Sequence, residues 1–224
     1  MSTREDILAR VRANLGVNAD DVARLRAARA ALAAGSSGPR PHLQGDLAAR
    51  FRAKSEAMAS TVDAVATLSE LPGAVARYLV SVGLPLRATC WPVLAGLDWV
   101  AAGVMIEARA ANGDDLTGIT GCFCAIAETG TLMLASGPDT AATTSLLPET
   151  HIAVVPVSRI VPAMEEGFAL LRAEQGDDLP RAVNFVSGPS RTGDIEQTIV
   201  LGAHGPYRVH LILVEDRPSP DSGP

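Results

Sequence analysis

The chain has 224 residues, of which 47% are hydrophobic and 20% are charged, an ordinary globular balance with enough length for one substantial core. A formal charge of −6 argues against nucleic acid as a partner, because nucleic-acid binders usually concentrate Lys and Arg on one surface. The longest apolar runs, such as Ile152 to Val157, are far shorter than the roughly 20 residues of a membrane span. The charged start of the chain does not resemble a signal peptide, so we expect a cytoplasmic protein without a membrane span.

The first forty residues predict two short helices followed by a break. Ile7, Val11 and Leu15 recur at helical spacing before Gly16, and an Ala-rich helix follows from Asp20 or Asp21 to Gly35. These helices could pack on the rest of the chain, pair with another subunit or stay partly ordered. Residues 35–41 are rich in Gly, Ser and Pro and indicate a linker. We expect a helical arm and linker at 1–45, a main domain at 46–216 and a flexible tail at 217–224.

The remaining segments predict alternating helices and strands. Apolar spacing predicts a long helix over 46–65 and a second helix over 73–83, with short strands possible at 87–93 and 99–107. Further strands are expected at 131–135, 151–157, 181–186 and 208–214, and helices at 143–147, 158–174 and 192–201. This alternation predicts an α/β fold with a mainly parallel sheet covered by helices on both faces. Ligands of such sheets usually bind beyond the carboxyl ends of the strands.

The three cysteines predict neither a disulfide framework nor a metal site. Cys122 and Cys124 are one residue apart, and Cys90 is the third. A structural zinc site or an iron–sulfur cluster needs about four ligands. We therefore expect no metal and no cofactor bound by this chain, and interpret Cys122 and Cys124 as small buried apolar residues at the start of a helix.

The first candidate site is a glycine-rich turn that we expect to join a strand to the helix over 192–201. Backbone N–H groups, a helix dipole and the Arg191 guanidinium would suit a phosphate or a carboxylate. A well-capped turn is the alternative, because acidic residues in the first helical turn could use up the dipole themselves. The candidate ligand-binding residues of this turn are Gly188, Pro189, Ser190, Arg191, Thr192 and Asp194, with Gly193 between the last two.

A second candidate site surrounds Glu128, which precedes the strand at 131–135. Glu128 is the candidate catalytic residue, as base, nucleophile or ligand anchor, although a lone glutamate is more often a helix cap or an ion-pair member. Thr129, Gly130 and Thr131 complete this loop, and the glycine would let the backbone approach a ligand closely. His204, in a later Gly-rich turn, could titrate near neutrality and contact a ligand, or stabilise the turn.

Four segments together resemble the lactate-utilization protein C family, which is built on the LUD domain. They are Ala125 to Leu132, Ser145 to Ile152, Ser187 to Glu196 and His204 to Pro206. The resemblance implies a fold like that of ribose-5-phosphate isomerase, glucosamine-6-phosphate deaminase and the CoA transferases. It also implies a part in oxidising L-lactate to pyruvate with two partner proteins, one carrying iron–sulfur clusters and one with cysteine-rich modules, so that this chain would be the cluster-free member. Relatives place an arginine in the loop before Ser145, whereas residues 137–144 contain none.

Three functions remain open at this point. The chain could be a ligand-binding or accessory subunit in which Arg191 holds a small anion. It could instead be a stand-alone enzyme that uses Glu128 on a phosphosugar or a CoA thioester, or an assembly scaffold. We expect Arg191 to face a cleft shared with Glu128, because loops that follow parallel strands gather at one edge of the sheet.

Overall fold

The structure is a computed structural model that describes residues 3–16, 18, 21–34, 45–176, 178–195 and 198–216. The chain divides into two compact units, residues 1–42 and residues 43–224. In the first unit, α1 (Arg4–Leu15) begins at a capping box between Thr3 and Asp6, and α2 (Val22–Ala34) follows. Neither helix contains a buried residue. The two predicted N-terminal helices are thus present, whereas the linker at 35–41 and the tail at 217–224 lie outside the described residues.

The second unit is built on a six-stranded sheet in which every pair of neighbouring strands is parallel. The strand order is β1-β12-β7-β4-β2-β3, so the last strand of the chain lies beside the first. This arrangement confirms the predicted parallel sheet. The strands are β1 (Thr61–Val65), β2 (Arg87–Cys90), β3 (Met105–Ala108), β4 (Thr117–Thr120), β7 (Thr150–Pro156) and β12 (Arg208–Val214).

Two smaller sheets complete the strand content of the described residues. A four-stranded sheet has the order β8-β5-β6-β9, with β5 and β6 forming an antiparallel hairpin and β9 antiparallel to β6. A separate antiparallel pair, β10-β11, follows β9. The bounds are β5 (Cys124–Ile126), β6 (Thr131–Ala135), β8 (Ile160–Val161), β9 (Val183–Val186), β10 (Arg191–Ile195) and β11 (Thr198–Leu201).

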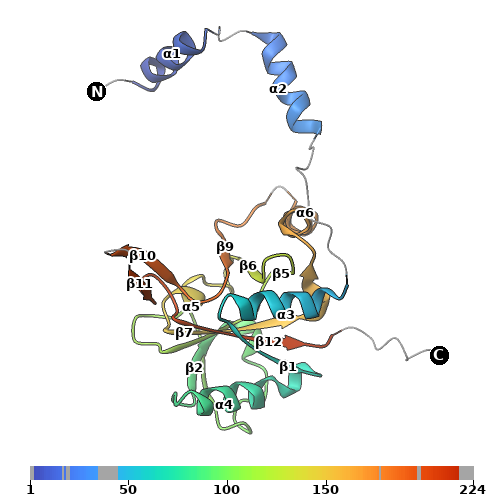
Figure 1. Ribbon diagram of the computed structural model, residues 1–224, viewed down its shortest axis with the longest axis vertical. Helices are drawn as coiled ribbons and strands as arrows, with labels where there is room; N and C mark the ends of the chain where they lie inside the picture. Colours follow the sequence, from blue (N-terminus) through green and yellow to red (C-terminus); the bar gives the residue numbers. More distant parts are fainter. Residues whose placement is uncertain are drawn as a thin grey trace, which may run out of the picture. The chain divides into compact units, whose positions relative to one another are not determined.

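Helices lie on both sides of the six-stranded sheet (Figure 1). On one face, α4 (Leu71–Ser81) packs against β1, β12, β7 and β4 through a buried cluster that includes Leu71, Val75 and Leu79. On the other face, Phe51 of α3 (Leu47–Ala57) shares a cluster with residues of the four-stranded sheet. The outer side of that small sheet is covered by α6 (Met164–Gln175). Helical cover on both faces is confirmed, although the four-stranded sheet shares one face with α3.

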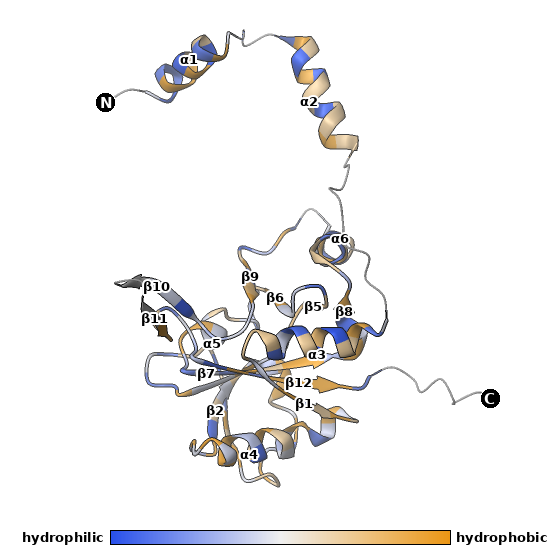
Figure 2. Ribbon diagram, viewed as in Figure 1, coloured by the Kyte–Doolittle hydropathy of each residue, from blue (hydrophilic) through white to orange (hydrophobic). Residues whose placement is uncertain are grey.

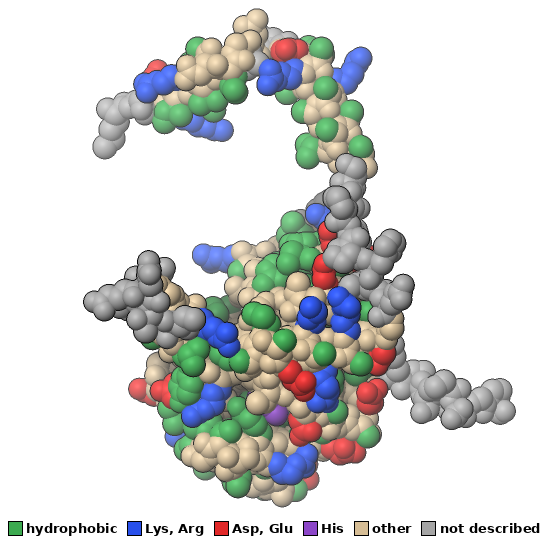
Figure 3. Space-filling model, viewed as in Figure 1, with side chains coloured by type: hydrophobic (Ala, Val, Ile, Leu, Met, Phe, Trp, Pro, Cys, Tyr) green, Lys and Arg blue, Asp and Glu red, His purple; other side chains and the backbone are tan. Residues whose placement is uncertain are grey.

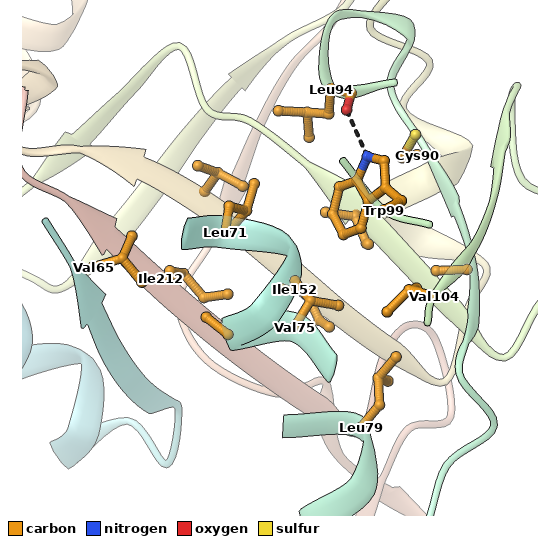
Figure 4. Close-up of a cluster of buried hydrophobic side chains, with 14 of the residues drawn as sticks. Val65, Leu71, Val75, Leu79, Cys90, Leu94, Trp99, Val104, Ile152 and Ile212 are labelled. Carbon is orange, nitrogen blue, oxygen red and sulfur yellow. Dashed lines mark hydrogen bonds between the residues drawn. The ribbon is translucent and has the colours of Figure 1, made fainter. Parts of the chain in front are cut away.

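The central strands are buried on both faces, which explains their nearly continuous apolar sequences. In β7, Ile152 and Val154 join the cluster under α4, while Ala153 and Val155 point to the α3 side. Figure 2 shows β12 in the colour of hydrophobic residues and α3 with both colours, as expected for a buried strand and a surface helix. Under α4, the Trp99 Nε1–H donates to the Leu94 carbonyl at 2.8 Å, which satisfies the indole inside the core (Figure 4).

The prediction of a helix over 192–201 is wrong, because its described residues lie in the antiparallel strands β10 and β11. Arg191 pairs with Leu201, and Thr192 pairs with Val200. The caps that suggested a helix were outweighed by β-branched residues, which favour strands because they lose side-chain freedom in a helix. These residues are Thr192, Ile195, Thr198, Ile199 and Val200.

Three further boundaries differ from the prediction. The helix expected over 46–65 ends at Ala57, because Ala59 adopts a left-handed φ of 66° and the next residues form β1 beside β12. Cys124 begins strand β5 and not a helix. The helix expected from residue 158 begins at Met164, after η3 (Val157–Arg159) and β8. The remaining short helices are η1 (Leu68–Glu70), η2 (Pro92–Leu94) and α5 (Thr143–Leu146). Across the described ranges, no helix has both the length and the apolar character that a membrane span requires.

Candidate functional site

Three of the four segments that resemble the lactate-utilization protein C family have loops that meet at one edge of the six-stranded sheet. The Ser190 N–H donates to the Pro206 carbonyl at 2.8 Å, and the Tyr207 N–H donates to the Glu149 carbonyl at 3.0 Å. Gly188, with φ of 75°, lies directly on the Met58 carbonyl, since a Cβ at Gly188 would be 2.2 Å from that oxygen. Met58 follows α3 and leads into β1, while Glu149 and Tyr207 immediately precede β7 and β12. The loops therefore gather at the amino ends of the parallel strands.

This placement corrects the expectation that the loops lie beyond the carboxyl ends of the strands. That expectation assumed that the strands before Gly188 and beside Glu128 belong to the parallel sheet. They are β9, β5 and β6, which form the four-stranded sheet, and β9 runs antiparallel to β6. The chain consequently leaves β9 beside the amino ends of β1 and β12, and the β10-β11 hairpin projects from this edge (Figure 1).

A pocket of about 510 Å³, here named the amino-edge pocket, lies among these loops. Its polar side is organised around Glu149, whose Oε2 accepts a hydrogen bond from the Tyr207 hydroxyl at 3.0 Å. The Arg208 guanidinium lies 4.3 Å from the centre of the Tyr207 ring. His204 is exposed. The lining residues are Leu146, Leu147, Glu149, Leu201, Gly202, Ala203, His204, Gly205 and Tyr207.

The Arg191 side chain is exposed at the start of β10, opposite Leu201 in the hairpin. It is not among the lining residues, but its strand partner Leu201 is. Of the backbone donors expected beside it, the Ser190 N–H is already used, because it donates to the Pro206 carbonyl. With no helix beginning here, the predicted anion site at a helix N-terminus is wrong, and the guanidinium is the cation that remains. The side chain of Asp194 lies outside the described part of the chain.

Glu128 lies in the tight turn between β5 and β6. Its side chain is half-buried, and its backbone N–H donates to the Pro162 carbonyl at 2.9 Å. Gly130 has φ of 69°, and a Cβ there would be 2.5 Å from the Ser55 nitrogen of α3. The Ser55 hydroxyl in turn donates to the Gly130 carbonyl at 3.2 Å. The close approach expected at Gly130 is therefore made to helix α3.

Hydroxyl groups connect the Glu128 turn to the Gly188 loop. The Oγ1 atoms of Thr129 and Thr131 are 2.7 Å apart, and Thr131 Oγ1 is 2.6 Å from Ser187 Oγ. Glu128 itself does not line the amino-edge pocket. The structure thus joins the two predicted loops through hydroxyls, with neither Glu128 nor Arg191 in the pocket lining.

Comparison with known proteins identifies the family. The sequence pattern of the LUD domain matches residues 93–214, which is more than half of the chain and includes every residue that lines the amino-edge pocket. The chain belongs to the LUD domain family.

Relatives that are named lactate utilization protein C match this chain over part of their length. The chain is 44% identical over 102 residues to lactate utilization protein C of Bacillus licheniformis, and 43% identical over 102 residues to the protein of that name in Bacillus subtilis. Each match covers 45% of this chain and 42% of the relative, so the matched part is less than half of either protein. A crystal structure of a DUF162 family protein from Deinococcus radiodurans superimposes with a TM-score of 0.56 at 26% identity, covering 78% of this chain and 99% of that one.

Sequence reasoning missed several residues that the LUD domain brings together. Glu149 and Tyr207 form the polar side of the amino-edge pocket, and Leu146 and Leu147 form part of its apolar rim. Most of them stand inside or next to quoted segments, so the segments were a usable signal. Ser187 was also missed, although its hydroxyl lies within one of those segments.

The three cysteines are free thiols in the structure. Burial raises the pKa of Cys90 and Cys124 to about 11, so both thiols are neutral at physiological pH. Within residues 3–16, 18, 21–34, 45–176, 178–195 and 198–216, His, Cys, Asp and Glu side chains form no group of three that could hold a metal ion.

Proposed function

We propose that this LUD domain protein is a component of lactate utilization. Its role is that of a cluster-free ligand-binding or accessory subunit in the oxidation of L-lactate to pyruvate. The observation that carries the proposal is the 44% identity to lactate utilization protein C within a chain whose family match contains the whole pocket lining. Electron transfer would occur in iron–sulfur and cysteine-rich partner proteins, since the three cysteines of this chain are fewer than the about four ligands that a cluster needs.

The ligand proposed for the amino-edge pocket is a small carboxylate such as lactate or pyruvate. Arg191 beside the rim and Arg208 beneath Tyr207 supply positive charge, and a guanidinium suits a planar carboxylate through two parallel hydrogen bonds. Glu149 is occupied by the Tyr207 hydroxyl, which limits its repulsion of an anion. The apolar rim formed by Leu146, Leu147 and Leu201 would exclude water around the bound group.

Calorimetric titration with L-lactate, pyruvate and phosphate tests the ligand. Arg191→Ala should weaken carboxylate binding by about 1.5 to 3 kcal/mol, the usual range for a hydrogen bond to a charged group. Arg191→Lys should restore only part of the affinity, because an ammonium cannot reproduce the planar fork. Arg172→Ala, in α6, serves as the matched control and should bind like the wild type. If Arg191→Ala lowers the melting temperature yet leaves each affinity unchanged, Arg191 is a structural brace and the anion site is wrong.

Native mass spectrometry of the protein purified from its own cell tests the partners. The proposal expects a complex with proteins that carry iron–sulfur clusters. A protein recovered alone, which turns over a phosphosugar or a CoA thioester and loses that activity in Glu128→Gln, would instead support the stand-alone enzyme. Under the proposal, Glu128→Gln leaves carboxylate binding unchanged, since Glu128 does not line the pocket.

A further inference from the structure

The β10-β11 hairpin forms a sheet of its own. Within the described part of the chain its two strands pair only with each other, so the outer edge of each strand is open. The hairpin projects from the edge of the six-stranded sheet at which the amino ends of the strands lie (Figure 1). An isolated two-stranded hairpin is marginally stable in water, whereas three or more strands with an apolar face can be stable. A further strand added to one open edge would therefore stabilise the hairpin.

The open edge of β11 presents the backbone groups of Leu201. Residues opposite each other in antiparallel strands alternate between pairs that share hydrogen bonds and pairs that do not. The Gly202 N–H donates to the Ser190 carbonyl at 2.9 Å. The neighbouring pair, Arg191 and Leu201, is therefore one that shares no hydrogen bond. The N–H and the carbonyl of Leu201 consequently point away from β10, towards the open edge.

The composition of β11 suits pairing with an identical strand. β11 contains no charged residue, whereas β10 contains Arg191 and Asp194. Charges on an edge strand oppose the addition of another strand, so β11 is the edge of this hairpin that can accept one. Two copies of one strand related by a two-fold axis pair antiparallel, with the same hydrogen bonds made by each copy. Because β11 is uncharged, such a pair brings no like charges together.

Exposed leucines lie beside the base of the hairpin. Leu146, Leu147 and Leu201 are 41%, 51% and 54% exposed, and all three line the amino-edge pocket. Figure 3 shows hydrophobic side chains at the surface beside the base of the hairpin. Single exposed apolar side chains are ordinary on a monomer, whereas several that gather beside an open strand mark an interaction surface. Leu201 belongs both to this group and to the open edge, so the two features form one surface.

We propose that the open edge of β11 binds the same edge of a second copy of this chain. The β11 strands of the two copies pair antiparallel and form a continuous sheet in the order β10-β11-β11-β10. In an antiparallel pair, the end of one strand lies beside the start of the other. The start of β11 in the second copy therefore lies beside Leu201, and each copy covers the exposed leucines at the amino-edge pocket of the other. This inference does not rest on the proposed carboxylate ligand.

Sedimentation velocity of the full chain, without ligand, tests the assembly. We expect a dimer with a dissociation constant on the order of 10 µM, because a short strand and a few leucines make a contact smaller than a standard interface. Leu201→Pro should weaken the dimer at least about tenfold, since proline has no N–H to donate to the second copy. The hairpin should tolerate this proline, because the Leu201 N–H is not bonded to β10.

Two matched variants separate the strand pairing from the loss of the leucine side chain. Leu201→Ala keeps the N–H and should weaken the dimer less than Leu201→Pro does. Leu179→Pro should dimerise like the wild type, because Leu179 is also exposed but lies outside the strands and outside the amino-edge pocket. Circular dichroism checks that each variant is folded.

Amide hydrogen exchange of the wild type locates the contact without a substitution. The Leu201 amide should exchange at least about tenfold more slowly in the dimer than in the diluted monomer. The proposal is overturned if the chain stays monomeric across a concentration series that brackets the expected dissociation constant, or if folded Leu201→Pro dimerises like the wild type. It is also overturned if exchange at Leu201 does not depend on concentration, which would place the contact elsewhere, for example on α1 and α2.

Discussion

Acidification from pH 7 to pH 5.5 should destabilise the core through two buried histidines. His151, in β7, is fully buried, and its Nε2 is 2.8 Å from Thr120 Oγ1. His210, in β12, is 5% exposed, and its Nδ1 is 2.8 Å from Thr61 Oγ1. The His210 ring stacks on Tyr78 of α4 with 3.8 Å between ring centres. One ring nitrogen of each histidine has no hydrogen-bond partner within the described residues.

Burial lowers the pKa of both histidines to about 4, because a buried charge loses its hydration. Asp63 opposes this lowering at His210 but does not overcome it. The native state therefore keeps both rings neutral, whereas the unfolded chain binds a proton at each below about pH 6.5. Their contribution to stability is complete above pH 6.5 and is lost as the pH falls towards 4.

The size of the effect follows from these values. Between pH 7 and pH 5.5, the difference in proton binding lowers the free energy of unfolding by about 1 kcal/mol for each histidine and about 2 to 3 kcal/mol for both. Carboxylates contribute little in this window, because unfolded Asp and Glu titrate near 4. A loss of this size is a large fraction of the stability of an ordinary domain.

Urea unfolding at half-unit pH steps, followed by circular dichroism, measures the loss. His151→Gln and His210→Gln should each remove about half of the pH dependence, whatever they do to absolute stability, since Gln does not titrate. His204→Gln is the control, because His204 is exposed and its removal should leave the slope unchanged. A wild-type slope equal to that of the double variant, or a titration of either ring near pH 6.5 by NMR, would refute the reasoning.

Other variants test the packing. Gly188→Ala should cost more than about 2 kcal/mol, because the Cβ would meet the Met58 carbonyl at a left-handed φ, whereas Gly113→Ala, in open space, should cost little in a thermal melt. Phe51→Ala should cost about 3 to 5 kcal/mol of unfolding free energy, and a loss below 1 kcal/mol would contradict its place in the core. A chain that begins at Asp46 should still unfold cooperatively, since α1 and α2 bury no residue; a broad transition would count against a separable arm. Metal analysis should find no stoichiometric iron or zinc, and one ion per chain would contradict this.

Two of the central strands, β7 and β12, could be predicted because their sequences indicate burial, whereas β4, between β7 and β2, was not predicted. β7 and β12 are continuous apolar runs, which are typical of strands covered on both faces, and their lengths matched within about a residue. The helix predicted over residues 61–65 was wrong for the opposite reason. Val62 and Val65 continue a helical apolar spacing, and the pairing of this segment with β12 depends on residues about 150 positions away. The local sequence pattern does not indicate a strand partner that is so distant in the chain.

Of the residues predicted to form a site, His204 is the one that lines the amino-edge pocket. The quoted segments contained most of the residues that line the amino-edge pocket, but their position was inferred from a single-sheet fold. The short strands β5 and β8 were not predicted, so the second sheet could not be foreseen, and neither could the turn of β9 towards the amino ends. The β10-β11 hairpin was not predicted, because its sequence contains both residues that cap helices well and β-branched residues that favour strands. Pairing between the two strands determines that strands form.

The position of β12 between β1 and β7 constrains how the chain can fold. β1 has no other strand neighbour in the described sheet, so it cannot pair until β12 has been synthesised. On a ribosome, α3 and β1 would emerge well before Arg208 to Val214 leave the exit tunnel, and the edge of the sheet would stay incomplete throughout. Such non-local pairing slows folding, because the loop-closure entropy is lost before the contacts that offset it can form. A nascent chain stalled before β12 should therefore be a good substrate for chaperones and proteases, even with most of its other secondary structure already synthesised.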